Sequence, residues 1–115
     1  MRKDLAFIEM LHNLLTVDAQ AGKLYWKPRP FDRFKTDDIG EQWNDENAGK
    51  EAFVRSGNGG AKWESINGMR QSASRIIWAM HHGKFPDGTI CHINNDQSDN
   101  RIENLTQKHS KDAGK

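Results

Sequence analysis

The sequence predicts one small α+β domain, and two patterns carry that prediction. Apolar residues recur at helical spacing in residues 4–17 and again in residues 73–82. Between these segments lie short runs with aromatic residues, separated by turns rich in Gly and Asn. Such a chain is expected to pack short antiparallel strands against an amino-terminal helix and a second helix.

The bulk properties describe a polar protein with a modest core. The chain has 115 residues, 35% of them hydrophobic, and a net charge of +1. Residues 1–58 hold nine basic and ten acidic side chains, whereas residues 59–115 hold eight and six, so a nucleic-acid surface in the second half is permitted but not demanded. We expect no membrane association and no signal peptide, because no apolar run has the required length.

The single cysteine, Cys91, excludes an internal disulfide bond and fits a reducing, cytoplasmic compartment. A second cysteine would be needed for a structural zinc finger of the paired-cysteine kind.

The first half of the chain is expected to support a site further along. Residues 4–17 form an amphipathic packing helix, and residues 24–26 form a short aromatic strand that Pro28 ends. Residues 31–47 are expected to be a long polar connection, anchored by Phe34 and Trp43. Arg29, Arg33 and Lys35 could contact phosphate in this region, and a solvated loop is an equally good interpretation.

Two strands and a hairpin are predicted next. Residues 52–55 and 61–66 flank a glycine-rich turn, and Asn67-Gly68 is a typical two-residue hairpin turn. The glycines do not form a phosphate loop, because no Gly-Lys-Ser/Thr ending follows them.

Residues 73–82 predict a helix that Ser72 or Ser74 caps and that Gly83 ends. The His81-His82 pair is not a two-point metal site, because adjacent helical side chains point about 100° apart.

The most informative stretch is residues 90–105. A short strand, Ile90-Cys91-His92-Ile93, should place His92 and Cys91 on opposite faces, although a local twist or bulge could bring both to one pocket. Residues 94–100 are rich in Asn and Asp and are suited to turns in which side chains bond their own backbone. Ile102 and Leu105 would anchor a return strand.

This stretch closely resembles the HNH endonucleases of the phage and homing type. The resemblance rests on a histidine, an Asn/Asp turn and the run Asp99-Asn100-Arg101-Ile102-Glu103-Asn104-Leu105. Residues 74–86 are similar to the segment that leads into the family's site. The resemblance implies a carboxyl-terminal ββα-metal finger in residues 73–115, supported by residues 1–72, within one HNH-type domain.

The resemblance also implies the chemistry of DNA phosphodiester hydrolysis in a bacterial cell, encoded by a phage or prophage. His92 would be the general base, since imidazole accepts a proton near neutral pH. Asn104 would bond the other ring nitrogen of His92 and fix its tautomer. One divalent ion, Mg²⁺, Mn²⁺ or Zn²⁺, would stabilise the developing charge. DNA phosphates would be contacted by Arg75, Lys84 and Arg101.

The expected metal ligands depart from the family pattern. Cys91 stands where the family has an acidic residue or histidine, and thiolate is a soft ligand that suits Zn²⁺ better than Mg²⁺. The family's last ligand would fall on Ala113, so Asp112 or His109 would have to replace it.

Three functions therefore stay open: a nuclease, a DNA-binding or regulatory module without a metal site, and a protein-interaction factor that inhibits another nucleic-acid enzyme.

Overall fold

The computed structural model describes residues 2–108, except for the side chains at positions 2, 3 and 58. The helices are α1 (Arg2–Leu14), α2 (Asp37–Asn47) and α3 (Ala73–His82), and the 3-10 turns are η1 (Phe31–Arg33), η2 (Asn58–Gly60) and η3 (Ile102–Asn104). The strands are β1 (Leu15–Asp18), β2 (Lys23–Trp26), β3 (Glu51–Ala52), β4 (Arg55–Ser56), β5 (Lys62–Ile66), β6 (Met69–Ser72), β7 (Thr89–His92) and β8 (Leu105–Lys108). This mixture confirms the predicted α+β class.

The described strands form three small antiparallel sheets. Their orders are β1-β2-β3, β4-β5-β6 and β7-β8. The β5–β6 hairpin turns at Asn67 and Gly68, whose φ angles of 52° and 80° are both positive, as a two-residue turn of this kind requires. The hairpin predicted from Asn67-Gly68 is therefore confirmed.

The core is organised around α3, which contacts α1 and strands from the first two sheets. Ile76 and Ile77 of α3 are fully buried, as their helical spacing predicts. The cap is Ser72, whose Oγ accepts the N–H of Arg75 at 3.2 Å, and the helix ends at Gly83 with φ of 78°. The buried apolar cluster comprises Leu11, Leu14, Leu15, Leu24, Ala52, Phe53, Ile66, Ala73, Ile76, Ile77, Met80 and Leu105.

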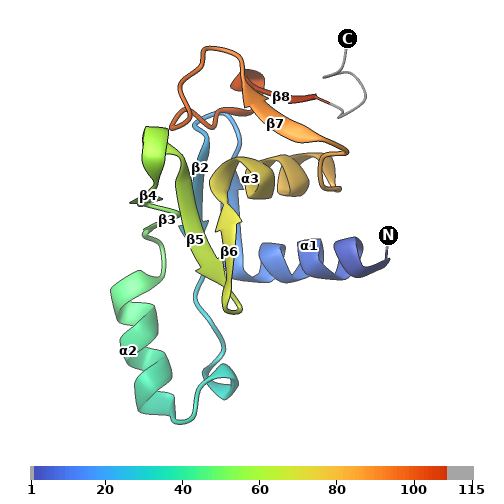
Figure 1. The fold of residues 1–115 in the computed structure, drawn as a ribbon. Coiled ribbons are helices and arrows are strands. Elements are labelled where there is room, and N and C mark those ends of the chain that lie inside the picture. The colour runs from blue at the N-terminus through green and yellow to red at the C-terminus, as the bar shows by residue number, and fades with distance from the viewer. Residues whose placement is uncertain (1, 109–115) are drawn as a thin grey trace.

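The molecule is elongated, with extents of 55 × 30 × 23 Å. Figure 1 shows the β7–β8 hairpin and its long loop at one end, and α2 with the turn before it at the other. No helix in the described part of the chain has the length and apolar character needed to cross a membrane.

The predicted first helix is too long at its carboxyl end. Helix α1 stops at Leu14, and the chain continues directly into strand β1, where Leu15 pairs with Trp26. Thr16 and Val17 are β-branched, which favours a strand once a neighbouring strand can pair with them. Tertiary pairing therefore overrides the helical spacing of Leu11 and Leu15.

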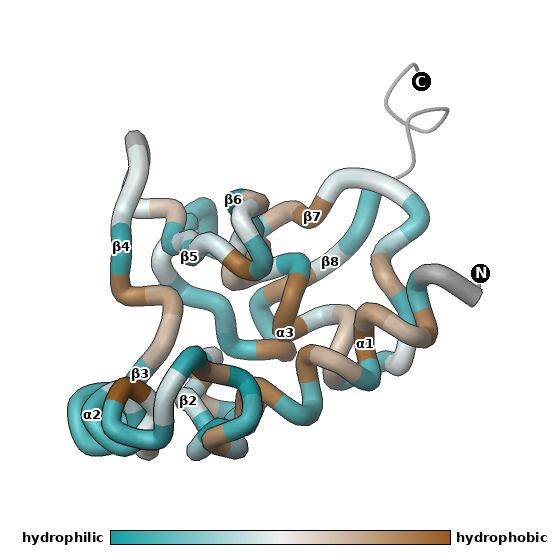
Figure 2. Tube along the Cα trace, turned by 90° about the horizontal axis from the view of Figure 1, so that it is seen from below, coloured by the Kyte–Doolittle hydropathy of each residue, from teal (hydrophilic) through white to brown (hydrophobic). Residues whose placement is uncertain are grey.

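The prediction of a polar connection over residues 31–47 is wrong, because α2 occupies its second half. Figure 2 colours α2 mainly as hydrophilic, so few apolar residues mark this helix in the sequence. The helix instead begins at a cap, where the Oγ1 of Thr36 accepts the N–H of Ile39 at 3.2 Å, with Asp37 and Asp38 in the first turn. The predicted anchors are confirmed, since the ring centroid of Trp43 lies 5.8 Å from that of Trp26 in β2 and 6.2 Å from that of Phe34.

Two strand predictions also need correction. The run 52–55 is divided between two sheets, because the chain turns at the buried Phe53, whose φ is 60°. The return strand after the Asn/Asp loop begins at Leu105 rather than Ile102, since Ile102–Asn104 form the turn η3.

Candidate active site

His92 is the last residue of β7 and lies directly opposite Leu105 of β8. Its Nε2 atom is 2.8 Å from the side-chain Oδ1 of Asn100. A carbonyl oxygen only accepts hydrogen bonds, so Nε2 carries the proton and donates a hydrogen bond to Asn100. The Nδ1 atom of the neutral ring therefore holds the free lone pair, which is the form a general base needs.

The prediction that Asn104 bonds the His92 ring is wrong, because the described structure does not contain this hydrogen bond. Asn100, which is 2% exposed, occupies that place. Both amides belong to the run that resembles the HNH family, and spacing alone gave no reason to prefer Asn100. Sequence reasoning missed this residue.

Asn104 instead holds the two ends of the 94–101 loop together. Its Oδ1 accepts the N–H of Asn94 at 3.0 Å, and its Nδ2 donates to the Oδ1 of Asn94 at 2.9 Å and to the carbonyl of Asp99 at 2.8 Å. The side chain is 5% exposed, so these bonds satisfy it within the protein. Asn104 thus fixes the loop that carries Asn100, and acts on His92 only through it.

The loop makes the side-chain turns that its composition predicts. The Oδ1 of Asn94 accepts the N–H of Asp96 at 2.9 Å, and the Oδ1 of Asp96 accepts the N–H of Ser98 at 3.0 Å. Hydrogen bonds from the hydroxyl and N–H of Ser98 lower the pKa of Asp96 below its ordinary value. Local bonds therefore favour the ionised carboxylate in the folded loop.

An ion-pair group closes the loop. The Nε and Nη2 atoms of Arg101 each donate to Asp99 at 2.8 Å, and its Nη1 donates to Glu103 at 2.9 Å. The side-chain bonds from Arg101 lower the pKa of Asp99 well below its usual range, and Asp99 in turn raises the pKa of Arg101. The guanidinium predicted to contact DNA is thus occupied by two carboxylates, and its DNA contact stays a prediction.

The amino-terminal hairpin supports this loop from outside. The N–H of Ile102 donates to the carbonyl of Ala19 at 2.8 Å. Gly22, with φ of 70°, lies so close that an added Cβ would overlap the backbone of Asn100 and Arg101. The turn between β1 and β2 is therefore part of the site's scaffold, a role that its sequence did not reveal.

A hollow of about 350 Å³ opens beside the histidine. Its lining brings together Cys91 and His92, although the β7–β8 register is regular and contains no bulge. Gln97 reaches the hollow from the loop, and an added Cβ on Gly59 would lie 3.2 Å from its Oε1 atom. The full lining is Ala61, Ser74, Ile90, Cys91, His92, Asn95 and Gln97.

No Asp or Glu side chain lines this hollow, so it lacks the carboxylates that a hard divalent ion favours. Cys91 supplies a soft thiol and His92 an imidazole, and among residues 2–108 no three His, Cys, Asp or Glu side chains converge on one point. His109 and Asp112, the other predicted ligands, lie outside the described residues. The predicted ββα-metal finger is therefore seen only as its two strands.

The other two residues predicted to contact DNA, Arg75 and Lys84, do not line the hollow. Arg75 is exposed on α3, with its Cζ 5.6 Å from the ring centroid of Phe85, and it lines a different, shallower surface. Lys84 is exposed just after the helix. The ring centroids of His81 and His82 lie 4.9 Å apart, and no third His, Cys, Asp or Glu side chain of the described chain converges on them.

Comparison with known proteins identifies the segment that holds this site. Residues 71–115 match the family model described as HNH endonuclease. The match covers α3, both strands of the hairpin and the loop between them. It confirms the resemblance on which the sequence analysis relied. No curated protein and no solved structure matches the chain.

Proposed function

We propose, from the match of residues 71–115 to the HNH endonuclease family model, that this chain hydrolyses phosphodiester bonds of DNA with His92 as general base. The observation that supports the proposal best is the hydrogen bond between His92 and Asn100, which is 2.8 Å long. It orients the imidazole and leaves Nδ1 free to accept a proton beside an open hollow.

In the proposed reaction, His92 Nδ1 removes a proton from a water molecule. The water oxygen forms a new bond to phosphorus as the bond to the 3′ oxygen breaks, and that oxygen takes a proton from solvent. The histidine must keep its orientation while its charge changes. Asn100 can accept from Nε2 throughout, so it stabilises the imidazolium as well as the neutral ring.

The rigidity of the 94–101 loop supports a role in positioning. Asn104 and Asn94 fix its ends, and Asp99 and Arg101 close it. A base held in one geometry needs less reorganisation to reach the reactive arrangement. We assign Asn100 as a positioning residue, since it would act through His92.

The family resemblance implies a divalent ion that would stabilise negative charge on the phosphate. Cys91 is the described side chain beside His92 that could ligate it, and a thiolate favours Zn²⁺ or a similar ion. The identity of the ion is therefore a question for the assay.

The test is cleavage of supercoiled plasmid DNA in the presence of Mg²⁺, Mn²⁺, Zn²⁺ or Ni²⁺. We expect nicking that His92→Ala reduces by about 10²- to 10⁴-fold, the usual contribution of a general base. His81→Ala is the matched control, because His81 is an exposed histidine outside the hollow. Equal activity of His92→Ala and the parent would contradict the proposal.

Asn100 can be tested by its pH profile. Asn100→Leu should lower the cleavage rate and shift the pH–rate curve, because the ring loses its acceptor. Gln97 lines the same hollow without bonding His92, so Gln97→Leu should leave that curve in place. A role in folding alone would change the amount of active protein but not the curve's position.

A DNA-binding module without hydrolysis is the second candidate, and the soft thiol of Cys91 in the hollow favours it. Binding of duplex DNA at low salt, with no cleavage under any of the four ions, would support this candidate. Cys91→Asp supplies a hard ligand at the same place, so it should gain Mg²⁺-supported nicking. Unchanged or lower activity would argue against Cys91 as a ligand position.

A further inference from the structure

Arg29 lies between β2 and η1 and is held in a fixed position by neighbouring residues. Its Cζ lies 3.9 Å from the ring centroid of Trp43 and 5.3 Å from that of Trp26. Asn44 of α2 holds the Arg29 backbone from both sides, accepting its N–H at 2.8 Å and donating to its carbonyl at 3.0 Å. Helix α2 thus fixes the arginine and the aromatic surface on which it lies.

The charge of Arg29 is not neutralised within residues 2–108. Its Nε atom is buried and has no hydrogen-bond partner there, and no carboxylate lies within 4.0 Å of the guanidinium. Arg33 lines the same cavity, and burial together with this second positive charge lowers the pKa of Arg29. A buried donor without a partner is costly, and an anionic ligand in the cavity would offset that cost.

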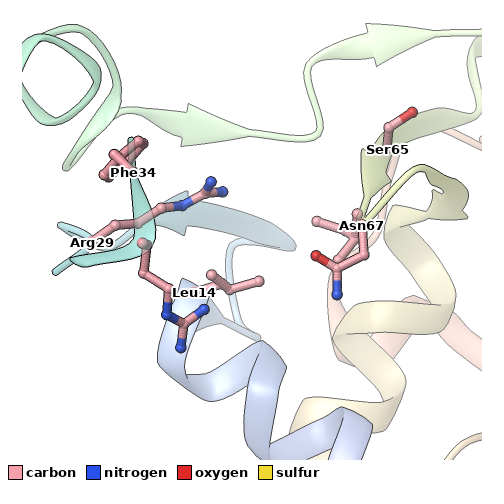
Figure 3. Close-up of a pocket in the computed structure, with 7 residues that line it drawn as sticks. Leu14, Arg29, Phe34, Ser65 and Asn67 are labelled. Atoms are coloured by element: carbon pink, nitrogen blue, oxygen red, sulfur yellow. The ribbon is translucent and has the colours of Figure 1, made fainter. Parts of the chain in front are cut away.

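The cavity that these arginines line has a volume of about 330 Å³. Figure 3 shows Arg29 and Phe34 on one wall, Asn67 across the opening, and Leu14 between them, while the hydroxyl of Ser65 points away. The amide nitrogen of Asn67 is already directed at the sulfur of Met10, 3.0 Å away. The charged donors in the lining are those of the two arginines.

We propose that this cavity binds a phosphate group through Arg29 and Arg33. The planar guanidinium presents paired N–H donors that match phosphate oxygens, and a dianion would relieve the repulsion between the two cations. The aromatic support of Arg29 keeps its donors in place before binding. The proposal does not rest on nuclease activity, because its residues and its cavity are distinct from those around His92.

Arg55 provides an internal contrast. It also lies beside a tryptophan, with its Cζ 5.4 Å from the ring centroid of Trp63, but its Nε is 3.6 Å from a carboxylate oxygen of Glu64. An arginine beside an aromatic ring is therefore not sufficient for the proposed site. Arg29 differs in its buried, unpartnered Nε and in the second arginine that shares its cavity.

The experiment is a titration of the full chain with inorganic phosphate at constant ionic strength, followed by NMR of the arginine Nε–H signals. We expect the Arg29 signal to shift and to saturate. Arg33→Gln should weaken the affinity by about tenfold or more, the loss expected for one charge-assisted interaction. This variant changes an exposed side chain, so folding should be retained, and Arg55→Gln is the matched control.

A parallel titration with a short DNA duplex distinguishes the source of the phosphate. A saturating shift with inorganic phosphate supports a site for a free phosphate group. A shift with the duplex alone, weakened by Arg33→Gln and not by Arg55→Gln, supports a backbone phosphate. No shift with either probe would overturn the proposal, as would equal losses in Arg33→Gln and Arg55→Gln. His92→Ala should leave all these shifts unchanged, which separates this test from that of cleavage.

Discussion

The 94–101 loop and the Arg29 cavity both depend on arginine, but they treat its charge in opposite ways. In the loop, Arg101 has three hydrogen bonds to two carboxylates, at 2.8–2.9 Å. In the cavity, Arg29 has aromatic rings and a second arginine as neighbours. The pKa of Arg101 is raised by Asp99, whereas that of Arg29 is lowered by burial and then by Arg33.

This difference distinguishes an arginine that stabilises the fold from one that can still bind a ligand. Arg101 belongs to the run that most resembles a nuclease, yet its donors are used to hold the loop that orients His92. Arg29 comes from a stretch whose sequence allowed either a phosphate contact or a solvated loop, yet its donors are left available. The hydrogen-bond and ion-pair partners of a residue in the folded chain indicate what it can still bind. The sequence motif that contains the residue is a weaker guide.

The largest expected effect concerns the contact that supports the loop. Gly22→Ala should lower the free energy of unfolding by about 2–5 kcal/mol, because the new Cβ would overlap the neighbouring backbone and Gly22 has a positive φ. Gly49→Ala is the control, since Gly49 has φ of 82° but no atom within 4 Å of an added Cβ. Chemical denaturation measures both, and equal losses would show that the contact contributes nothing.

A second test removes the side chain that joins the loop ends. Asn104→Ala should cost about 2–4 kcal/mol, because Asn94 and the carbonyl of Asp99 lose their buried partner. Hydrogen exchange should rise in the 94–101 loop while the Arg29 Nε–H signal stays unchanged. A simultaneous change at Arg29 would show that the two ends of the molecule are coupled.

Removal of the charge should affect the thermal midpoint differently at the two arginine sites. Arg101→Gln should lower the thermal midpoint slightly, because Asp99 and Glu103 lose an exposed partner. Arg33→Gln should leave the midpoint unchanged or raise it, because Arg29 loses a repulsive neighbour. Differential scanning calorimetry at low salt measures both shifts. A clear loss of stability in Arg33→Gln would imply a structural role for that charge.

The smallest effect is the response of the loop to acid. The folded pKa values of Asp96 and Asp99 lie below their ordinary values, so their stabilising contribution is fully present above the unfolded pKa, near 4, and is lost as pH falls through the folded values. The loop should therefore keep its amide protection down to about pH 4. Loss of protection between pH 6 and 5 would contradict these assignments.

The sequence predicted those parts of the fold that carry a local signal. Helix α3 has an apolar face, a serine cap and a terminal glycine, and the hairpin at Asn67-Gly68 has a two-residue turn with a known preference. Helix α2 was missed because it contains few apolar residues, so that its main local signal is the cap at Thr36. The change of Leu15 from helix to strand depends on pairing with Trp26, which no local pattern reveals.

The site was predictable in its position but not in its contacts. The run around His92 located the histidine and the turn-forming loop. The choice between Asn100 and Asn104 as partner of the ring depends on which amide the loop places beside Nε2. Ala19 and Gly22 support the 94–101 loop through contacts between parts of the chain that are distant in sequence. Local sequence patterns do not predict such contacts.

The contact between Ala19 and Ile102 has a consequence for how the site arises during folding. The two residues lie near opposite ends of the described chain, so the loop gains its outer support only after the β1–β2 hairpin and the β7–β8 hairpin have met. Contacts of such long sequence separation generally form late. The orientation of His92 would then be among the last features of the native state to appear, and a segment limited to residues 71–115 would lack the surface on which the loop is ordered.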